Sequence, residues 1–149
     1  MQKKGFLLMK PEAIQRNFIG KIFSVLEDKG LKIIGFKMLQ PTTEQIYELY
    51  KQYQELPHFK RLIECTSDGP VIPVVVSTVG DIDPAELLTQ MQGRYNIAGT
   101  IRFDLASHIS RNVIHCSDDY IVAEKELSIF FKKDEICDYE KVLDQFLID

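Results

Sequence analysis

The chain has 149 residues, of which 45% are hydrophobic and 27% are charged, and its formal net charge is −4. This size and composition are typical of one globular domain over residues 1–149. The acidic balance argues against a general nucleic-acid or anionic-membrane binder, although a small anion could still bind where a few Lys and Arg side chains share one cleft.

Neither a membrane span nor a secretion signal is expected. No apolar run approaches the ~20 residues that a spanning helix needs, and the apolar piece of MQKKGFLLMK is too short for a signal peptide. Three widely spaced cysteines argue against a disulfide framework and suit a reducing compartment, so we expect the cytoplasm. No CxxC pair or zinc-like His/Cys spacing occurs, so the protein alone is not expected to bind a metal.

The first elements in chain order are a strand, a helix and a second strand. GFLLMK (5–10) is a short apolar run that predicts a buried strand ending at Lys10. Pro11 suits the first turn of a helix whose apolar residues recur at helical spacing up to Leu26, and Gly30 suits its C-terminal cap. Residues 31–39 are the next strand candidate.

The middle of the chain predicts two helices and a third strand. Thr42 and Gln45 form a capping-box pattern at the start of a helix, and residues 57–66 indicate a second short helix. Residues 69–78 are rich in Val and predict a buried strand. Pro73 within this strand requires an edge position or a bulge, because proline cannot donate to a sheet ladder.

The last third predicts a helix, a long loop, a strand and further helix. Asp83 is an N-cap candidate for the next helix, whereas residues 93–111 show no periodicity, and loops of this length are often functional. NVIHCS (112–117) predicts a fourth strand, residues 119–131 an amphipathic helix, and residues 134–149 a short helix and tail. Four strands with helices between them favour an α/β sandwich in which the helices pack on the sheet.

His115 is the first candidate for chemistry. It ends a predicted strand, and Glu126 follows eleven residues later in a predicted helix that can return a carboxylate to the imidazole. A carboxylate on one ring nitrogen fixes the tautomer and leaves the other nitrogen free to attack. The alternative is a surface salt bridge without a chemical role.

Phosphate binding would have to use scattered cations, because the chain lacks GxGxxG and Walker A motifs. Lys10 ends the first strand, Arg102 lies in the long loop, and Arg111 and Asn112 precede the last strand. A phosphoryl group in transfer spreads its charge over several oxygens, so fixed cations and amide donors are useful around it. Solvated charges and a turn asparagine are the alternatives.

Taken together, these stretches resemble the nucleoside diphosphate kinase family. The matching stretches are LLMKPEAIQR, GKIFSVLEDKGLKIIGFKML, LYKQY, SDGPVIPVVV, GTIRFD, RNVIHCSD and AEKELSIFF, in order along nearly the whole chain. The resemblance implies a ferredoxin-like fold with a four-stranded antiparallel sheet. It also implies ping-pong transfer of the γ-phosphate from nucleoside triphosphates to diphosphates through a phosphohistidine. The implied cofactor is Mg²⁺, and the implied assembly is a homohexamer or homotetramer, with a homohexamer favoured by the long tail.

The resemblance also assigns roles to single positions. His115 matches the catalytic histidine, Glu126 the carboxylate that orients it, and Ser117 the partner of that carboxylate. Lys10 matches a catalytic lysine that contacts the transferring phosphate. The positions matching nucleotide contacts are Lys10, Tyr50, Arg102, Ile109 and Asn112, with Ile109 on one face of the base. Asp118 matches a position that could hold Mg²⁺ through water.

Four positions depart from the family pattern. His58 stands where a base-stacking Phe is usual, which predicts weaker base binding. Glu86 aligns with an expected phosphate-binding Arg, and Arg94 is a candidate to replace it. Gln92 falls where a Thr is expected, and Cys116 where a Gly is expected; its thiol is either harmless or sensitive to oxidation.

Two kinds of function are therefore compared. The first is an active phosphotransferase, favoured by the retained polar set around His115. The second is a weakened relative that binds nucleotides as a scaffold or regulatory protein, and His58 and Glu86 are the residues that would favour it.

Overall fold

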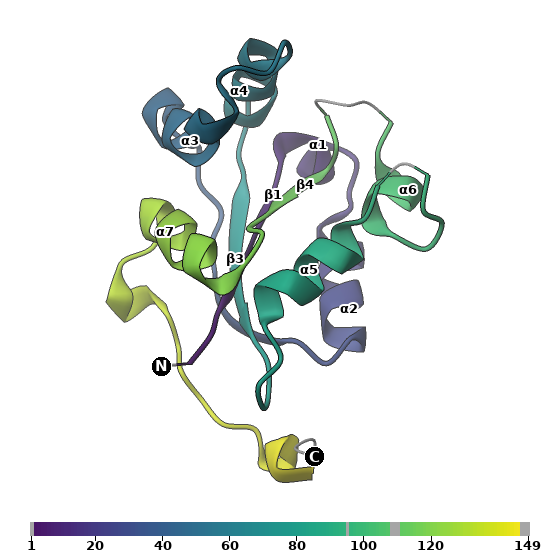
Figure 1. Ribbon diagram of the computed structural model, residues 1–149, viewed down its shortest axis with the longest axis vertical. Helices are drawn as coiled ribbons and strands as arrows, with labels where there is room; N and C mark the ends of the chain where they lie inside the picture. Colours follow the sequence, from purple (N-terminus) through teal and green to yellow (C-terminus); the bar gives the residue numbers. More distant parts are fainter. Residues whose placement is uncertain (1, 95, 108–110, 147–149) are drawn as a thin grey trace.

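A computed structural model describes residues 2–94, 96–107 and 111–146 of the chain (Figure 1). Its described strands are β1 (Gly5–Met9), β2 (Lys32–Phe36), β3 (Ile72–Ser77) and β4 (Ile114–Cys116). Its described α-helices are α1 (Pro11–Gln15), α2 (Ile19–Asp28), α3 (Thr43–Tyr50), α4 (Phe59–Ser67), α5 (Pro84–Gln92), α6 (Ile101–Leu105) and α7 (Tyr120–Phe130). Short 3₁₀ turns are η1 (Lys51–Tyr53), η2 (Lys133–Glu135) and η3 (Val142–Phe146).

The strands form one antiparallel sheet in the order β2-β3-β1-β4. β1 and β3 are central and buried on both faces, which explains why their sequences are continuous apolar runs. This four-stranded antiparallel sheet covered by helices confirms the ferredoxin-like α/β arrangement expected from the resemblance.

Helices cover both faces of the sheet, and each face has its own hydrophobic core (Figure 1). One core joins the sheet to α2 and α5, and the other joins it to α3, α4 and α7. Because side chains alternate along a strand, Ile114 and Cys116 of β4 face the first core, while His115 between them points to the opposite face. Leu8 pairs with His115 across the sheet and belongs to the second core.

Local capping explains why several helices begin where they do. Thr42 accepts a hydrogen bond from Gln45 N at 3.1 Å, and the Gln45 side chain accepts one from Thr42 N at 2.9 Å, so the predicted capping box is confirmed. Asp83 caps α5 through Ala85 N at 2.9 Å. Asp119 caps α7 by accepting from Ile121 N and Val122 N.

Two predicted elements differ from the structure in the first half. The helix expected from Pro11 onward is broken at Asn17, whose φ of 61° is left-handed, a conformation that asparagine tolerates. The strand expected over 31–39 is shorter and ends at Phe36, and its ladder with β3 has a register shift between Ile33 and Gly35. Pro73 lies in the central strand β3 and not at an edge. Its carbonyl accepts from Lys37 N at 3.4 Å just beyond the end of β2, and proline has no N–H to donate in return.

Two further differences lie in the second half. The predicted loop 93–111 contains helix α6, which Thr100 caps. The helix expected over 134–149 is replaced, as far as residue 146, by η2 and η3. This C-terminal segment is tied to the sheet by Lys32, whose ammonium donates to Tyr139 O and approaches Asp144 at 3.4 Å. Within the described residues, no helix combines the length and apolar character needed to cross a membrane.

Candidate active site

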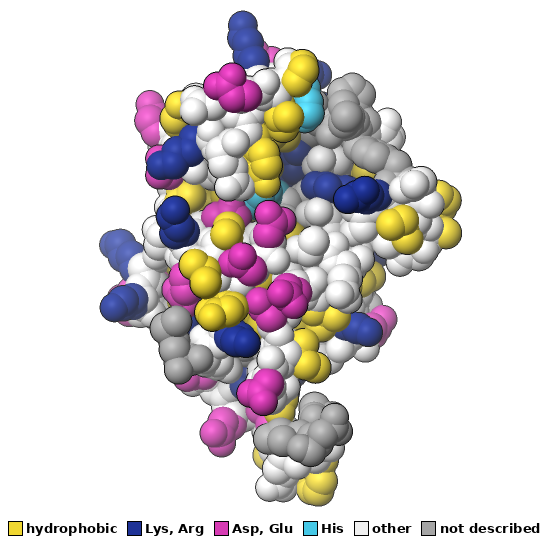
Figure 2. Space-filling view, viewed as in Figure 1, with side chains coloured by type: hydrophobic (Ala, Val, Ile, Leu, Met, Phe, Trp, Pro, Cys, Tyr) yellow, Lys and Arg dark blue, Asp and Glu magenta, His cyan; other side chains and the backbone are white. Residues whose placement is uncertain are grey.

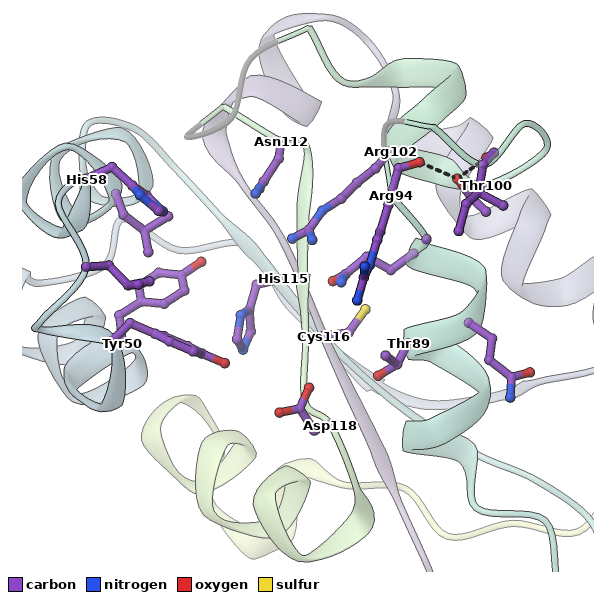
Figure 3. A pocket seen from close by; sticks show the side chains of 17 residues that line it. Tyr50, His58, Thr89, Arg94, Thr100, Arg102, Asn112, His115, Cys116 and Asp118 are labelled. Carbon is purple, nitrogen blue, oxygen red and sulfur yellow. Dashed lines mark hydrogen bonds between the residues drawn. The ribbon is translucent and has the colours of Figure 1, made fainter.

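A cavity of about 650 Å³ opens above β4, a size typical of a small-molecule site. Figure 2 shows a hollow in this face, with Lys or Arg side chains along one side and hydrophobic side chains along the other. The wall from the end of α3 through η1 to α4 contributes Tyr50, Tyr53, Leu56, His58 and Leu62. The wall from α5 to α6 contributes Thr89, Gln90, Gln92, Gly93, Arg94, Ile97, Thr100 and Arg102. Asn112, His115, Cys116 and Asp118 lie between the two walls (Figure 3).

His115 is held by a buried carboxylate behind the cavity. Its Nε2 lies 3.0 Å from both carboxylate oxygens of Glu126 on α7, and both side chains are less than a tenth exposed. Ser117 donates from Oγ to Glu126 Oε1 at 2.7 Å and so orients the carboxylate. Because a carboxylate only accepts, this contact places the hydrogen on Nε2 and leaves the lone pair on Nδ1. The burial of this pair excludes the alternative of a surface salt bridge.

A strained turn leads into β4 and positions Asn112. Val113 has a φ of 77°, which is unfavourable for a β-branched residue, and Ile114 N donates to Asn112 O at 2.9 Å across it. Lys10 N donates to Val113 O at 2.9 Å, and Lys10 Nζ donates to Asn112 Oδ1 at 2.9 Å. The end of β1 and the start of β4 are therefore joined at the edge of the cavity.

Positive charge is concentrated at this edge. Lys10 is only 1% exposed; burial lowers its pKa to about 7, and the nearby positive charge of Arg102 adds to the shift. Arg102 Nη2 donates to Ile114 O at 3.0 Å, and its buried Nε has no hydrogen-bond partner among the described residues. Arg111, grouped with these residues by sequence, instead pairs with Asp68 at the end of α4. The remaining cations are suited to an anionic ligand.

Two phenols line the wall next to His115. The Tyr50 ring lies edge-on to the imidazole, with ring centroids 5.1 Å apart and an interplanar angle of 84°. Burial raises the pKa of Tyr50 above its usual range, so its hydroxyl remains protonated and can donate. Tyr53 lies beside Tyr50, with centroids 6.3 Å apart, and burial together with the charge of Asp118 raises its pKa too.

Cys116 carries a thiol rather than a reactive thiolate. It is 6% exposed at the cavity wall, and burial raises its pKa to about 12. Since the thiolate is the form that reacts with oxidants, the structure favours the harmless-residue interpretation over the oxidation-sensitive one.

The structure brings most of the sequence candidates together. Tyr50, His58, Gln92, Arg94, Arg102, Asn112, His115 and Asp118 all line the cavity. Lys10, Ser117 and Glu126 support it from behind through the hydrogen bonds given above. Ile109 lies outside the described residues.

Glu86 requires a correction. Its side chain is exposed on α5 and is not among the cavity-lining residues, so the structure does not bring Glu86 to a phosphate site. The α5 residues that line the cavity are Thr89, Gln90 and Gln92, all further along the helix than Glu86.

Sequence reasoning also missed Tyr53, Thr89 and Thr100, all of which line the cavity. Tyr53 could have been found from its spacing of three residues after Tyr50, which places two side chains on one side of a helix. Thr89 Oγ1 donates towards Ser117 O at 3.2 Å, a contact between α5 and the turn after β4 that no sequence pattern indicates.

Comparison with known proteins gives one consistent family. The family model described as nucleoside diphosphate kinase matches residues 3–136. The chain is 40% identical over 142 residues to the nucleoside diphosphate kinase of Methanothermobacter thermautotrophicus, covering 93% of each protein. It is 38% identical over 149 residues to that of Methanobrevibacter smithii, covering 99% of each. Among solved structures it resembles a halophilic nucleoside diphosphate kinase from Halobacterium salinarum in complex with CDP, with a TM-score of 0.91, 30% identity and full coverage of both chains.

Proposed function

The chain belongs to the nucleoside diphosphate kinase family, and from this premise we propose that His115 is the residue that carries the phosphate between nucleotides. The chain is accordingly a phosphotransferase that acts on nucleotides. The observation that carries the assignment to His115 is the buried contact between its Nε2 and Glu126, next to a cavity lined by cations.

The proposed reaction has two half-steps. In the first, the lone pair of His115 Nδ1 attacks the γ-phosphorus of a nucleoside triphosphate. The Nδ1–P bond forms while the bond from phosphorus to the β-phosphate oxygen breaks, and the electron pair leaves with the diphosphate. In the second, a terminal oxygen of another diphosphate attacks the phosphorus and forms an O–P bond, while the N–P bond breaks and its electron pair returns to Nδ1. Glu126 stabilises the positive charge that the imidazole gains while it carries the phosphate.

Electrostatic stabilisation of the transferring group is assigned to the cations around Asn112. Arg102 has an unused Nε donor within the described structure, and the phenol of Tyr50 is a protonated donor beside the imidazole. Lys10 is partly neutral near pH 7, and a bound phosphate chain would favour its charged form. Holding the phosphate in line with Nδ1 is the main source of rate enhancement expected for this chemistry.

The nucleobase is assigned to the outer part of the η1–α4 wall. His58 and Leu62 line the cavity there, so an imidazole replaces the larger phenyl ring expected from the family pattern. An imidazole offers less area for stacking than a phenyl ring. Stacking is available to every base, so broad nucleotide specificity with weaker base binding is expected. Ile109 is proposed for the opposite face of the base on the strength of the resemblance alone.

The nucleotide is proposed to arrive as its Mg²⁺ complex. Asp118 lines the cavity with an exposed carboxylate, and Mg²⁺ typically binds one or two carboxylates together with substrate phosphates. No cluster of three or more His, Cys, Asp or Glu side chains suited to a metal occurs among the described residues, so the phosphates would have to supply most ligands. When bound, the ion would neutralise charge on the phosphates, with Asp118 as the residue that holds it through water.

Assembly and compartment are proposed from surface features. The C-terminal turn η3 exposes Val142, Leu143 and Phe146 and lies at one end of the molecule (Figure 1). We propose that these side chains pack against a neighbouring subunit in a homohexamer, with a homotetramer as the other arrangement, and light scattering would distinguish them. None of the three cysteines is paired, which suits the cytoplasm. Nothing favours the alternative of a weakened scaffold or regulatory protein.

The test is a two-step labelling experiment. The protein is incubated with ATP labelled in the γ-phosphate, separated from nucleotide, and then given an unlabelled diphosphate. We expect an acid-labile label on the protein that passes to the diphosphate, and no label on His115→Ala. A matched control is His58→Ala, which should still become labelled. Equal labelling of His115→Ala and the unaltered protein would refute the assignment.

A further inference from the structure

The segment between α5 and α6 brings two arginines to one wall of the cavity. Arg94 lies near the start of this segment, after Gly93, and Arg102 follows it in the first turn of α6; both line the cavity. Figure 3 shows both side chains reaching from the same upper side toward His115 and Cys116. Two like charges in one cavity repel each other, so the backbone must hold them in place until an anion offsets the repulsion.

One hydroxyl connects the two arginine-bearing segments. Thr100 Oγ1 donates to Ile97 O at 2.7 Å and lies 3.3 Å from Arg94 O, which closes the loop that begins at Arg94. The same oxygen accepts from Phe103 N at 3.3 Å and thereby caps α6, the helix of Arg102. Ile97 N also donates to Arg94 O at 3.2 Å, so the Arg94 carbonyl is fixed from two sides.

The start of the loop is fixed against the same threonine. Gly93 has a φ of 64°, which glycine adopts without strain, and a Cβ at this position would lie 2.1 Å from Thr100 Cβ. The Thr100 side chain therefore packs directly on the Gly93 backbone, immediately before Arg94. The two ends of the loop meet at this contact, which leaves Arg94 little freedom to move its backbone out of the cavity wall.

We propose that Thr100 is a positioning residue that holds Arg94 and Arg102 as a pair, and that Arg94 is a second guanidinium contact for the phosphate chain of the nucleotide. The proposal rests on the proposed function of the cavity as a phosphate-transfer site. Preorganised cations stabilise phosphate charge without reorganising during the reaction. A guanidinium also offers paired N–H donors to phosphate oxygens, which favours the phosphate chain over the base as its ligand.

The test uses variants that distinguish the role of the Thr100 hydroxyl in phosphate binding from its role in the stability of the fold. Thr100→Val removes the hydroxyl, Thr100→Ser keeps it, and Arg94→Gln removes the charge from an exposed side chain whose loss should not unfold the protein. Thr42→Val is the matched control, because Thr42 caps α3 in the same way but does not line the cavity. Inhibition by tripolyphosphate measures phosphate binding without a base, and inhibition by adenosine measures base binding without phosphate.

We expect Arg94→Gln to weaken tripolyphosphate binding by about tenfold, as for loss of one charge-assisted contact, and to leave adenosine binding unchanged. Thr100→Val should weaken tripolyphosphate binding by about fivefold, Thr100→Ser should restore it, and Thr42→Val should lower the melting temperature without this loss. The double variant Thr100→Val/Arg94→Gln should lose less than the product of the two single effects, because the part of the Thr100→Val effect that acts through Arg94 is already lost with Arg94→Gln.

The proposal is overturned if Arg94→Gln binds tripolyphosphate as well as the unaltered protein does, or if the two single effects multiply in the double variant. It is also overturned if Thr100→Ser loses as much affinity as Thr100→Val, since the hydroxyl would then be irrelevant. Failure of the proposed function has a different signature, namely absence of label on His115 in the unaltered protein, while tripolyphosphate affinity can still be compared among the variants.

Discussion

The Glu126→Gln variant separates the charge of the orienting group from its shape. Glutamine fills the same buried space, so Ser117 retains an acceptor. Its amide, however, carries a single oxygen, whereas both Glu126 oxygens lie 3.0 Å from His115 Nε2. With the oxygen on Ser117, the amide NH₂ faces Nε2, and a facing donor favours the tautomer with the hydrogen on Nδ1. The lone pair needed for attack is then on the wrong nitrogen.

The size of the effect follows from the lost interaction. A hydrogen bond to a charged group contributes about 1.5–3 kcal/mol, and the pair is buried, so solvent does not replace it. Each 1.36 kcal/mol corresponds to about a tenfold change in rate, so we expect the phosphorylation rate to fall by about ten- to a hundredfold. The affinity for nucleotide should change little, because Glu126 does not line the cavity.

The assay is rapid-quench measurement of phosphoprotein formation from labelled ATP under single-turnover conditions. Glu124→Gln is the matched control, because Glu124 lies on the same helix but pairs with Lys4 at the surface. A Glu126→Gln rate equal to that of Glu124→Gln would refute the reasoning. A parallel loss of nucleotide affinity and of melting temperature would also refute it, because it would indicate a structural role only.

Three further expectations concern pH, the base and the thiols. The pKa of Lys10 is lowered to about 7, and a bound phosphate chain favours the ammonium form, so diphosphate affinity should fall above pH 7 and binding at pH 8 should take up a proton. Calorimetry in buffers of different ionisation heat would measure this proton uptake. Equal apparent binding enthalpies in these buffers would contradict it. His58→Phe should tighten diphosphate binding by a few-fold through added stacking area, and unchanged affinity for all bases would remove the idea. Burial raises the pKa of Cys116 to about 12, so alkylation of the native protein should modify the exposed Cys137 first. A mass spectrum in which Cys116 is modified before Cys137 would contradict this.

Patterns within a few residues of one another predicted the structure well. The capping box at Thr42 and the N-cap at Asp83 were both confirmed, because such caps depend on hydrogen bonds between near neighbours. The apolar runs of β1 and β3 were also read correctly, since burial on both faces leaves no room for alternation. The break at Asn17 was not foreseen, because the apolar spacing continues across it and only the backbone conformation ends the helix.

The site depended more on contacts between distant segments. The strand–turn–helix excursion after His115 predicted that Glu126 could return to the imidazole, and the structure brings the two together. The 93–111 segment gave no periodic signal, because α6 is only five residues long and the loop before it is closed by the side chain of Thr100. Because the geometry of this loop cannot be read from the sequence, Glu86 was expected in the cavity wall, where the structure has Thr89 and Gln92.

The position of the phosphate on the imidazole tests the central claim most directly. Phosphoprotein prepared with ATP can be studied by NMR that correlates phosphorus with the ring nitrogens of His115. Because Glu126 holds Nε2, we expect a single phosphate on Nδ1, and we expect it to disappear when a diphosphate is added. Phosphate on Nε2, or on a residue other than His115, would contradict the role given to Glu126 and the mechanism built on it.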